Sequence, residues 1–509
     1  MREQSKYIKD IRTVSYYSGY ITLVTSMLML IPILTSLLSA EYNVVLDFVI
    51  SITIALSTGI ILIIFGQRAS KKLEWKHGLI VASLSWVILM ILCAIPYYLS
   101  GNTNSFLDAA FDVMSGFTTT GLVLTQNLDH LSLGLNMWRH MLTFVGGQGM
   151  VVLALTFLVK DTVGAYKMYV GEGKDIELVP NVKNTAKIIW TISMVYLTIG
   201  TLILWIDGML IGLKPDSSLS HGLFIFMSTW STGGFAPMSQ NILYYHSFSY
   251  EIITLILFII GSLNFGLHYA VWQGKKKEVL KNIEVQSFFI TVTLTAFFIV
   301  LSLSKLSVYP NAVALFRKGV YSLLSAHTTT GVGTLYARQF ALEWGDFSVL
   351  MLIIAMLIGG SACSTAGGFK GLRVGVVFKG IIADIRKMLG SERRIKIYKF
   401  HYIKDQVLED GMVKSAAFII ICYMILFTIG TALGTYYGYP ALSAAFEAAS
   451  VTGNVGLSIG ITTPTMPSLM KIYYIIAMYL GRLEFISVFV LIGFIFGGVK
   501  RLCLRYSRH

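Results

Sequence analysis

Long runs of apolar residues alternate with short polar segments along the whole chain. Ten of these runs are near or above the roughly 20 residues that a helix needs to cross a bilayer: 14–38, 45–65, 78–99, 135–159, 187–213, 250–272, 286–304, 347–377, 413–436 and 470–499. The first run is longer than the apolar core of a cleavable signal peptide, and residues 38–40 are a poor cleavage site. The pattern therefore predicts ten transmembrane helices, the first of them a true span.

Shorter apolar segments lie between some of these runs. Two examples are SFLDAAFDVMSGF at 105–117 and ALSAAFEAASV at 441–451. A helix of that length measures roughly 16–20 Å, whereas the hydrocarbon core of a bilayer is about 30 Å thick. These segments are too short to cross the membrane. We expect each of them to enter it and return to the side from which it came.

A repeated phrase follows the short segments. It is clearest in GFTTTGLVL at 116–124 and AHTTTGVGT at 326–334, and two weaker copies share its register. When the four copies are aligned on a glycine, each has an aromatic residue ten positions earlier and a serine six positions earlier. The aligned residues are Gly121, Gly234, Gly331 and Gly456; Phe111, Phe224, Tyr321 and Phe446; and Ser115, Ser228, Ser325 and Ser450. Long apolar runs flank every copy, so the sequence predicts one helix–loop–helix unit written four times.

The predicted fold is an all-α polytopic membrane protein. Four helix–pore loop–helix repeats in a pseudo-fourfold arrangement follow two N-terminal transmembrane helices. The expected divisions are an N-terminal extension at 1–70 and pore repeats at 71–160, 161–275, 276–390 and 391–509, of which the third holds a gating loop.

The repeated phrases suit a filter for cations. A short helix that ends within the membrane leaves its last carbonyl groups unpaired, and a glycine there lets the chain turn into an extended strand. Backbone of this kind is tolerated at that depth only where it lines an aqueous path. Four strands around one axis would present a ring of carbonyl oxygens that replaces the water shell of a cation. We call the four expected filter segments 1 to 4: Thr118, Thr119, Thr120 and Gly121; Ser231, Thr232, Gly233 and Gly234; Thr328, Thr329, Thr330 and Gly331; and Gly453, Asn454, Val455 and Gly456.

Small residues also have a simpler explanation in membrane proteins. Glycine, serine and threonine let neighbouring helices pack closely, and one TTTG phrase by itself is better explained in that way. Four copies that share an aromatic residue, a serine and a glycine in one register favour the filter instead.

Charge sets an orientation for the spans. The chain of 509 residues is 55% hydrophobic and 13% charged, with a mean hydropathy of +0.70 and a net charge of +14. Of its 40 lysines and arginines, 32 lie in six segments that share one side of the membrane: 1–13, 67–77, 160–187, 273–282, 370–414 and 499–509. By the positive-inside rule that side is the cytoplasm. The sequence therefore predicts a multi-pass protein of the cell membrane with both termini cytoplasmic, and its charge reflects topology rather than nucleic-acid binding.

Two further features interrupt apolar runs. IGGSACSTAGGFKG at 358–371 contains five glycines, each about 1 kcal/mol worse than alanine in a helix. Close helix packing accounts for the glycines alone, but serines, a threonine and a lysine at the same depth favour an unwound segment that lines a cavity. Arg482 lies inside the last run, where a lone charge costs about 2.5 kcal/mol or more, and Glu484 cannot share its face of a continuous helix. Arg482 either pairs with a carbonyl for structure alone or lines the path.

At these residues the sequence resembles the Trk/Ktr/HKT superfamily of potassium transporters. The resemblance covers nearly the whole chain, and the two extra N-terminal helices make it most similar to the bacterial Trk membrane subunit. A glycine in every filter segment, including Gly121 in the first, is the family pattern associated with potassium, whereas sodium-selective relatives have serine in the first segment. The fourth copy, TGNVGL, departs most from TTTG, as is common in the family. The resemblance implies that K⁺ is the transported ion and that this chain binds no organic cofactor.

The resemblance also implies a gate beneath the filter. In the family, the loop that corresponds to 358–371 lies there, and an arginine that corresponds to Arg482 adds a positive barrier to cations. The residues expected at the gate are Gly359, Gly360, Ser361, Gly367, Gly368, Lys370 and Arg482.

Family resemblance further implies partners. Membrane subunits of this kind form homodimers in which each protomer has its own pore, and a cytoplasmic RCK-type nucleotide-binding regulatory subunit docks on them. The expected docking region is the basic stretch 370–414, which follows the predicted gate and includes Arg393 and Arg394. Binding of acidic lipid head groups is the simpler role for such basic loops.

Three classes of function follow, with potassium uptake driven by the membrane potential as the leading one. A sodium- or proton-coupled secondary transporter would be expected to have inverted repeats, whereas these four units run in one orientation. The ion-conducting subunit of an ATP-driven potassium pump shares the fourfold pore but needs a separate ATPase chain. An enzyme is not expected, because GLSIG at 456–460 matches a nucleophile pattern but overlaps filter segment 4. Four cysteines without paired spacing predict neither a disulfide framework nor a zinc site.

Overall fold

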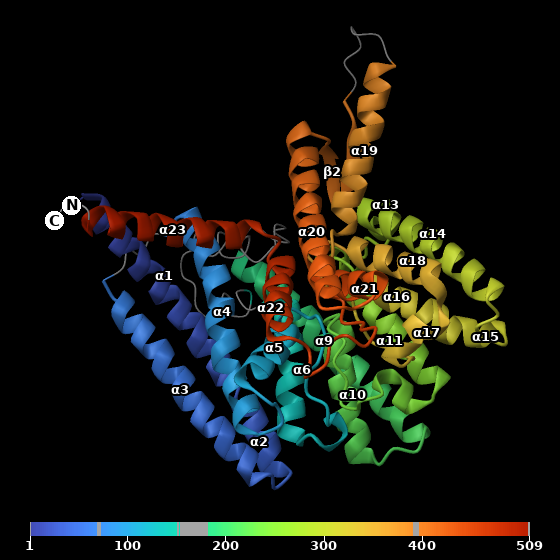
Figure 1. Cartoon of the computed structure of the whole chain (residues 1–509), viewed down its shortest axis with the longest axis horizontal. Coiled ribbons are helices and arrows are strands. Elements are labelled where there is room, and N and C mark those ends of the chain that lie inside the picture. The colour runs from blue at the N-terminus through green and yellow to red at the C-terminus, as the bar shows by residue number, and fades with distance from the viewer. Residues whose placement is uncertain (1, 69–72, 150–151, 153–181, 390–396, 507–509) are drawn as a thin grey trace.

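The predicted fold class is confirmed by the structure, a computed structural model that describes residues 2–68, 73–149, 152, 182–389 and 397–506. The described residues form helices almost throughout, apart from loops and one short hairpin of two strands. Figure 1 shows the N-terminal extension packed along one side of the four repeats.

The N-terminal extension consists of α1 (Arg2–Met27), α2 (Leu30–Leu38) and α3 (Tyr42–Gly66). α1 and α3 approach closely because glycines line their contact: a Cβ on Gly66 would lie 2.6 Å from the Cβ of Tyr16. The carboxylate of Glu41 ties the extension to repeat 1. It accepts the backbone N–H groups of Leu133 (2.8 Å) and Gly134 (3.1 Å) at the start of α6, where a helix favours a negative charge.

Each repeat has a first helix, a short pore helix and a second helix. The first helices are α4 (Trp75–Leu99), α9 (Val182–Leu210), α14 (Ile283–Lys305) and α20 (Asp410–Tyr436). The pore helices are α5 (Phe106–Phe117), α10 (Pro215–Trp230), α16 (Tyr321–His327) and α21 (Ala441–Thr452). The second helices begin with α6 (Leu133–Gln148), α11 (Phe248–Gly261), α18 (Gly345–Ile358) and α22 (Ser468–Arg482). The aromatic residue shared by the four pore helices is buried in each of them.

Shorter elements connect these helices. The 3₁₀ helices η1 (Leu128–His130) and η2 (Asn241–Tyr245) follow filter segments 1 and 2, α17 (Ala337–Glu343) follows segment 3, and α15 (Ala312–Ala314) and the π-helix η3 (Leu315–Val320) lead into α16. Beyond the second helices lie α12 (Phe265–Trp272), α13 (Glu278–Lys281), α19 (Gly371–Met388) and α23 (Ile486–Tyr506). An antiparallel hairpin of β1 (Lys399–Tyr402) and β2 (Lys404–Val407) separates α19 from α20.

The ten predicted spans are not all continuous helices. Among the described residues, six helices are long and apolar enough to cross a membrane by length and composition. The runs at 250–272 and 470–499 are instead bent, by 98° between α11 and α12 and by 116° between α22 and α23. The run at 347–377 is interrupted after α18, as its glycines predicted. The run at 135–159 is helical up to Gln148, and most of its remainder lies outside the described residues.

The bends have a common physical cause in the way that second helices meet the pore helices. Glycines on the second helices press against the carbonyl oxygens that end the pore helices. A Cβ on Gly261 would lie 2.2 Å from the oxygen of Trp230, and one on Gly481 would lie 2.4 Å from that of Thr452. Each helix ends within a residue or two of this contact, and the chain turns away from the filter.

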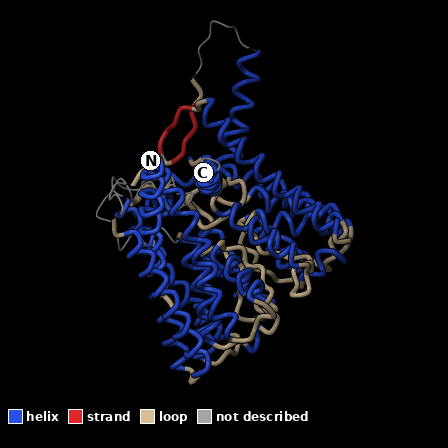
Figure 2. The backbone as a smooth tube through the Cα atoms, turned by 60° about the vertical axis from the view of Figure 1, so that its left-hand side comes forward, coloured by secondary structure: helices blue, strands red, loops and turns tan. Residues whose placement is uncertain are grey.

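Both termini, the hairpin and the tip of α19 lie at one end of the molecule, which we call the basic end (Figures 1 and 2). α19 projects beyond the rest of the fold there, and α23 runs from α22 past α4 toward the C-terminus (Figure 1). The turn between α2 and α3 lies at the opposite end.

Candidate ion pathway

The four filter segments share one backbone geometry. Two positions in each have positive φ angles: the second residue (Thr119 53°, Thr232 51°, Thr329 55°, Asn454 53°) and the glycine (Gly121 88°, Gly234 71°, Gly331 75°, Gly456 94°). The N–H of the third residue donates to the carbonyl of the serine shared by the copies, at 2.8 Å every time: Thr120 to Ser115, Gly233 to Ser228, Thr330 to Ser325 and Val455 to Ser450. This bond closes a helix end when the preceding residue is left-handed. The register read from the sequence thus corresponds to one backbone unit present four times.

The four glycines close a ring. A Cβ added at any of them would lie 1.9–2.6 Å from a carbonyl oxygen of the next segment: Gly121 against Gly233, Gly234 against Thr330, Gly331 against Val455 and Gly456 against Thr120. No side chain fits at such distances, so glycine is required at each of these positions. The segments meet in the order 1, 2, 3, 4 and back to 1. Their carbonyl oxygens are thereby gathered around one axis, as cation coordination by backbone oxygens needs.

A cavity of about 450 Å³ opens on one side of this ring. Its lining includes all four filter glycines and the residues that follow each segment, among them Leu124, Asn241 and Ser458. Arg139 also lines it; the guanidinium stacks over Phe235 and donates to the carbonyl oxygen of Ala236 at 3.3 Å. The cavity thus ends at the ring of filter glycines.

The glycine-rich loop, which we define as residues 359–370, lies against the other side of the ring. All of its residues are buried. It contacts every filter segment: the Thr119 and Thr232 hydroxyls donate to Thr365 O (3.4 Å) and Oγ1 (3.1 Å), the Gly367 N–H donates to Thr329 Oγ1 (2.8 Å), and a Cβ on Gly367 would lie 2.3 Å from Gly453 O. The loop is therefore packed directly against all four filter segments.

The loop leaves and re-enters the fold through a narrow neck. Its last residues bond back to the end of α18: the N–H groups of Phe369, Lys370 and Gly371 donate to the carbonyls of Leu357, Ile358 and Gly360 at 2.8–2.9 Å. A Cβ on Gly359 would lie 2.2 Å from the oxygen of Gly367 and 2.8 Å from the Cα of Gly368. The sequence prediction of an unwound segment is thus matched by the backbone, and the neck depends on these glycines.

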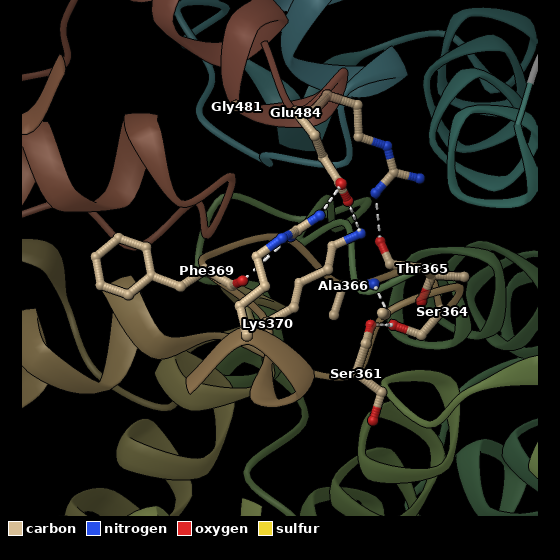
Figure 3. A network of polar contacts seen from close by, with 12 residues as sticks. Ser361, Ser364, Thr365, Ala366, Phe369, Lys370, Gly481 and Glu484 are labelled. Atoms are coloured by element: carbon tan, nitrogen blue, oxygen red, sulfur yellow. Dashed lines mark hydrogen bonds and ion pairs between the residues drawn. The ribbon is translucent and has the colours of Figure 1, made fainter. Parts of the chain in front are cut away.

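Arg482 joins the loop to two other elements. Its Nη1 donates to the carbonyl oxygen of Thr365 at 2.6 Å, a bond drawn as the dashed line that ends on Thr365 in Figure 3. Its Nη2 donates to the carbonyl oxygens of Gly146 (2.8 Å) and Gly147 (3.0 Å) at the end of α6. The two interpretations left open by the sequence are therefore not exclusive, because Arg482 pairs with carbonyls and also lies against the loop.

Glu484 is a site residue that sequence reasoning missed. α22 ends at Arg482, and Glu484 stands in the turn before α23 with a φ of 54°. Its buried carboxylate forms ion pairs with Lys370, at 2.5 Å, and with Arg373 (Figure 3). The loop is therefore held at two points from the turn between α22 and α23. Arg482 bonds to Thr365 in the middle of the loop, and Glu484 pairs with Lys370 at its end. Both ion pairs of Glu484 are with residues other than Arg482, in keeping with the spacing argument, but that argument did not foresee the two cations that the turn brings to Glu484.

Two more buried carboxylates were missed, although the repeat register could have revealed them. Asp112 and Glu447 each stand nine residues before a filter glycine, in copies 1 and 4, and both are fully buried. They hold the chain just beyond the filter: Asp112 accepts from Leu124 N (2.7 Å) and Thr125 Oγ1 (2.6 Å), and Glu447 from Ser458 Oγ (2.5 Å), Ile459 N (3.1 Å) and Thr462 Oγ1 (3.0 Å). These residues brace the cavity wall.

The chain is similar to known proteins over almost its full length. The family model TrkH, described as cation transport protein, matches residues 46–495. The Trk system potassium uptake protein TrkH of Halomonas elongata is 28% identical over 492 residues, which cover 95% of this chain and 98% of that protein. An uncharacterized cation transporter of Methanocaldococcus jannaschii is 28% identical over 499 residues, with 97% and 98% covered.

A solved structure agrees with these sequence matches. The crystal structure of the potassium transporter TrkH from Vibrio parahaemolyticus superimposes with a TM-score of 0.79 at 25% identity, over 94% of this chain and 98% of that one. Fold, filter geometry and family match point the same way, and the chain belongs to the TrkH family of cation transport proteins.

Proposed function

We propose that this protein is the ion-conducting membrane subunit of a potassium uptake system. The observation that carries the proposal is the closed ring of four filter segments, with an open cavity on one side and a buried loop on the other. Relatives of nearly equal length are named potassium uptake proteins, which supports potassium as the ion. The membrane potential drives entry, and 100 mV is worth about 2.3 kcal/mol for each charge.

Backbone carbonyl oxygens of filter segments 1 to 4 bind the dehydrated ion. Side-chain hydroxyls in segments 1 and 3 are engaged elsewhere: Thr118 Oγ1 lies 2.8 Å from Thr120 Oγ1 and donates to the carbonyl of Met114 at 2.7 Å, and Thr328 and Thr330 repeat the first contact. This supports coordination by the backbone rather than by threonine side chains. The protein has no enzymatic activity in this proposal, and K⁺ is its cargo.

The glycine-rich loop is the gate. Four glycines let the loop fold under the filter: Gly359, Gly360, Gly367 and Gly368. Ser361 is a buried residue near its start, and Lys370 at its end forms an ion pair with Glu484. Arg482 holds the closed position through Thr365. Opening requires the loop to leave the filter threonines and the arginine together.

The basic end faces the cytoplasm, with both chain termini there. The protein forms a homodimer in which each protomer has its own pore, and an RCK-type nucleotide-binding subunit docks on the basic end. Clustered lysines and arginines and the projecting α19 support this site. Arg393 and Arg394 lie outside the residues that the structure describes.

Rubidium flux into liposomes that contain only the purified chain tests the proposal. We expect saturable flux that follows an imposed potential and is competed by potassium more strongly than by sodium. Flux that requires a sodium or pH gradient would indicate a coupled transporter instead. Co-purification of an ATPase chain, with flux only in the presence of ATP, would indicate a pump subunit.

A further inference from the structure

The entry of the glycine-rich loop is held by the break between α11 and α12 in repeat 2 and by the first turn of α14 in its own repeat. Three consecutive residues are fixed by backbone hydrogen bonds. The Ser361 N–H donates to the carbonyl of Ser262 at 3.1 Å, the Ala362 N–H donates to Glu284 Oε1 at 2.5 Å, and the carbonyl of Cys363 accepts from Phe265 N at 3.2 Å. Two of these contacts come from the break between α11 and α12, and the third comes from the first turn of α14.

Glu284 is the charged member of this anchor and is fully buried. Its other oxygen, Oε2, accepts from Asn264 Nδ2 at 3.2 Å. The amide oxygen of Asn264 meanwhile caps α12 by accepting from Gly266 N at 2.7 Å. Hydrogen bonds to a charged acceptor are stronger than those between neutral groups, so the carboxylate is a firm link between the loop and the α11–α12 break.

The β-hairpin reaches the same anchor. The hydroxyl of Tyr402 accepts from Asn264 Nδ2 at 3.2 Å. Tyr402 and Phe400 belong to a small apolar cluster, separate from the main core, which joins the hairpin to α14, α19 and α20 through Ile283, Val376 and Ala416. On the opposite face of the strand, His401 lies 2.6 Å from Glu278 of α13 and 2.7 Å from Asp405 of β2. The hairpin is thus seated at the basic end with one side chain directed toward the loop anchor.

We propose that the hairpin transmits changes at the basic end to the gate through Tyr402, Asn264 and Glu284. Displacement of the hairpin breaks the Tyr402–Asn264 bond, which leaves Asn264 less well held against Glu284. Glu284 in turn holds Ala362 less firmly, and the loop leaves the filter more readily. Asn264 and Glu284 are positioning residues in this scheme. The inference rests on the proposed function, in that the loop is taken to be the gate.

Two conservative variants test the contact of Tyr402 with Asn264 and the contacts of Glu284 separately. Tyr402→Phe removes one hydroxyl and keeps the ring in its apolar cluster. Glu284→Gln keeps the size of the side chain but leaves one acceptor oxygen for two donors, so either Ala362 or Asn264 loses its bond. Tyr437→Phe is the matched control, since it removes a hydroxyl from a residue just beyond the far end of α20.

Cys363 supplies a readout that does not depend on transport. It lies in the loop and is 3% exposed, so a small thiol reagent modifies it only when the loop has moved. In a background with Cys93, Cys422 and Cys503 replaced by alanine, we expect Tyr402→Phe to raise the labelling rate about fivefold, the factor for about 1 kcal/mol, which is typical of one hydrogen bond. Glu284→Gln should raise it at least as much, with Tyr437→Phe equal to the parent. Thermal melting of each variant checks the fold.

Coupling between the links is tested in the double variant. If Tyr402 acts through Glu284, the effects of Tyr402→Phe and Glu284→Gln on labelling will be less than multiplicative. Rubidium flux should rise in the same order as labelling. Variants that melt like the parent and label at the parental rate overturn the inference, while labelling that rises in a protein without rubidium flux overturns the proposed function and leaves the mechanical link standing.

Discussion

At the scale of single residues, the filter is a strained backbone that its surroundings hold in place. Thr119, Thr232 and Thr329 have positive φ angles, which β-branched residues rarely adopt, and such conformations cost of order 1–3 kcal/mol each. In segments 1 and 2 the threonine hydroxyl bonds at 2.7 Å to the preceding carbonyl. All three threonines also contact the glycine-rich loop. The glycine-rich loop therefore helps to hold the filter segments in this conformation.

Substitution of Gly121 tests the ring. Gly121→Ser places a Cβ 2.6 Å from the oxygen of Gly233, at a φ of 88° that serine resists. We expect the ratio of potassium to sodium flux to fall about fivefold or more, as a distortion of 1 kcal/mol would give. Gly333→Ser is the control, because its nearest contact lies at an ordinary 3.5 Å. Unchanged selectivity in a conducting Gly121→Ser protein would contradict the assignment of segment 1.

Two variants of Arg482 separate the effect of its positive charge from the effect of its hydrogen bonds. Arg482→Ala removes three hydrogen bonds from a charged donor, each worth about 1.5–3 kcal/mol, so we expect rubidium flux to rise about tenfold. Arg482→Lys keeps the charge but cannot bond to Thr365 and α6 at once. If the lysine variant conducts like alanine, the fork of hydrogen bonds holds the gate. If the lysine variant conducts like wild type, the positive charge holds the gate. Wild-type flux in both would leave Arg482 a structural residue only.

Much of the filter was predictable at this scale, whereas the buried carboxylates that hold the glycine-rich loop beside it were not. Repetition of glycine, serine and aromatic residues gave the register of all four segments without any three-dimensional information. Glu284 and Glu484 have no such signal, because each acts on a residue at least 78 positions away. Both are placed by helix breaks, and a single acidic residue in an apolar run does not reveal where its partner will lie.

At the scale of elements, the predicted spans differ from the structure mainly in the second helices. A hydropathy profile gives the length of an apolar run but does not show whether the helix within it bends. Five glycines revealed the interruption at 359–370, while single glycines at 261 and 481 did not distinguish a bend from close packing.

Shortening the glycine-rich loop tests whether it blocks the path. A deletion within 359–368 should raise basal rubidium flux, because the contacts of Thr365 and Gly367 with the filter threonines are lost. Size-exclusion profile and thermal melting identify variants that still fold. A well-folded deletion with unchanged flux would remove the gating role.

The stability that the β-hairpin contributes is expected to depend on pH. Asp405 and Glu278 accept hydrogen bonds from His401 and raise the pKa of its imidazole above the ordinary value. The stabilisation is therefore complete below the ordinary pKa and is lost as the pH rises through the raised one. We expect His401→Gln to melt below wild type at acidic pH and to match it at alkaline pH, with exposed His130→Gln unaffected throughout. A constant difference across pH would show that the ion pairs contribute nothing.

At the scale of the whole molecule, ion pairs join three junctions between repeats among the described residues: the pairing of Lys370 and Arg373 of repeat 3 with Glu484 of repeat 4, and two more. Lys471 of repeat 4 bonds to Asp108 of repeat 1 at 2.6 Å, and Arg317 of repeat 3 bonds to Glu251 of repeat 2 at 2.7 and 2.8 Å. In the ring order these last two junctions lie opposite one another. Repeat 4 is thus tied to repeat 1, and repeat 2 to repeat 3, by an ion pair at each of these two junctions.

Regulation from the basic end is tested by charge reversal. Arg393→Glu with Arg394→Glu should weaken capture of a nucleotide-binding subunit about fivefold or more, since each surface charge contact is worth up to about 1 kcal/mol. Lys214→Glu with Lys305→Glu, exposed on the other predicted side, is the matched control. If the native complex contains only this chain, and nucleotides leave its flux unchanged, the partner proposal fails while the pore stands.

The ring of four glycines belongs to one continuous chain, and this has a consequence for how the protein can change over time. In a channel assembled from four identical subunits, every mutation is applied four times at once. Here a single codon alters one quadrant and leaves three intact. Segment 4 already differs, since Asn454 replaces a threonine and its amide donates to Thr120 Oγ1 (3.1 Å) and Met478 O (2.9 Å). Each of the four segments can therefore change by substitution on its own, without the same change in the other three.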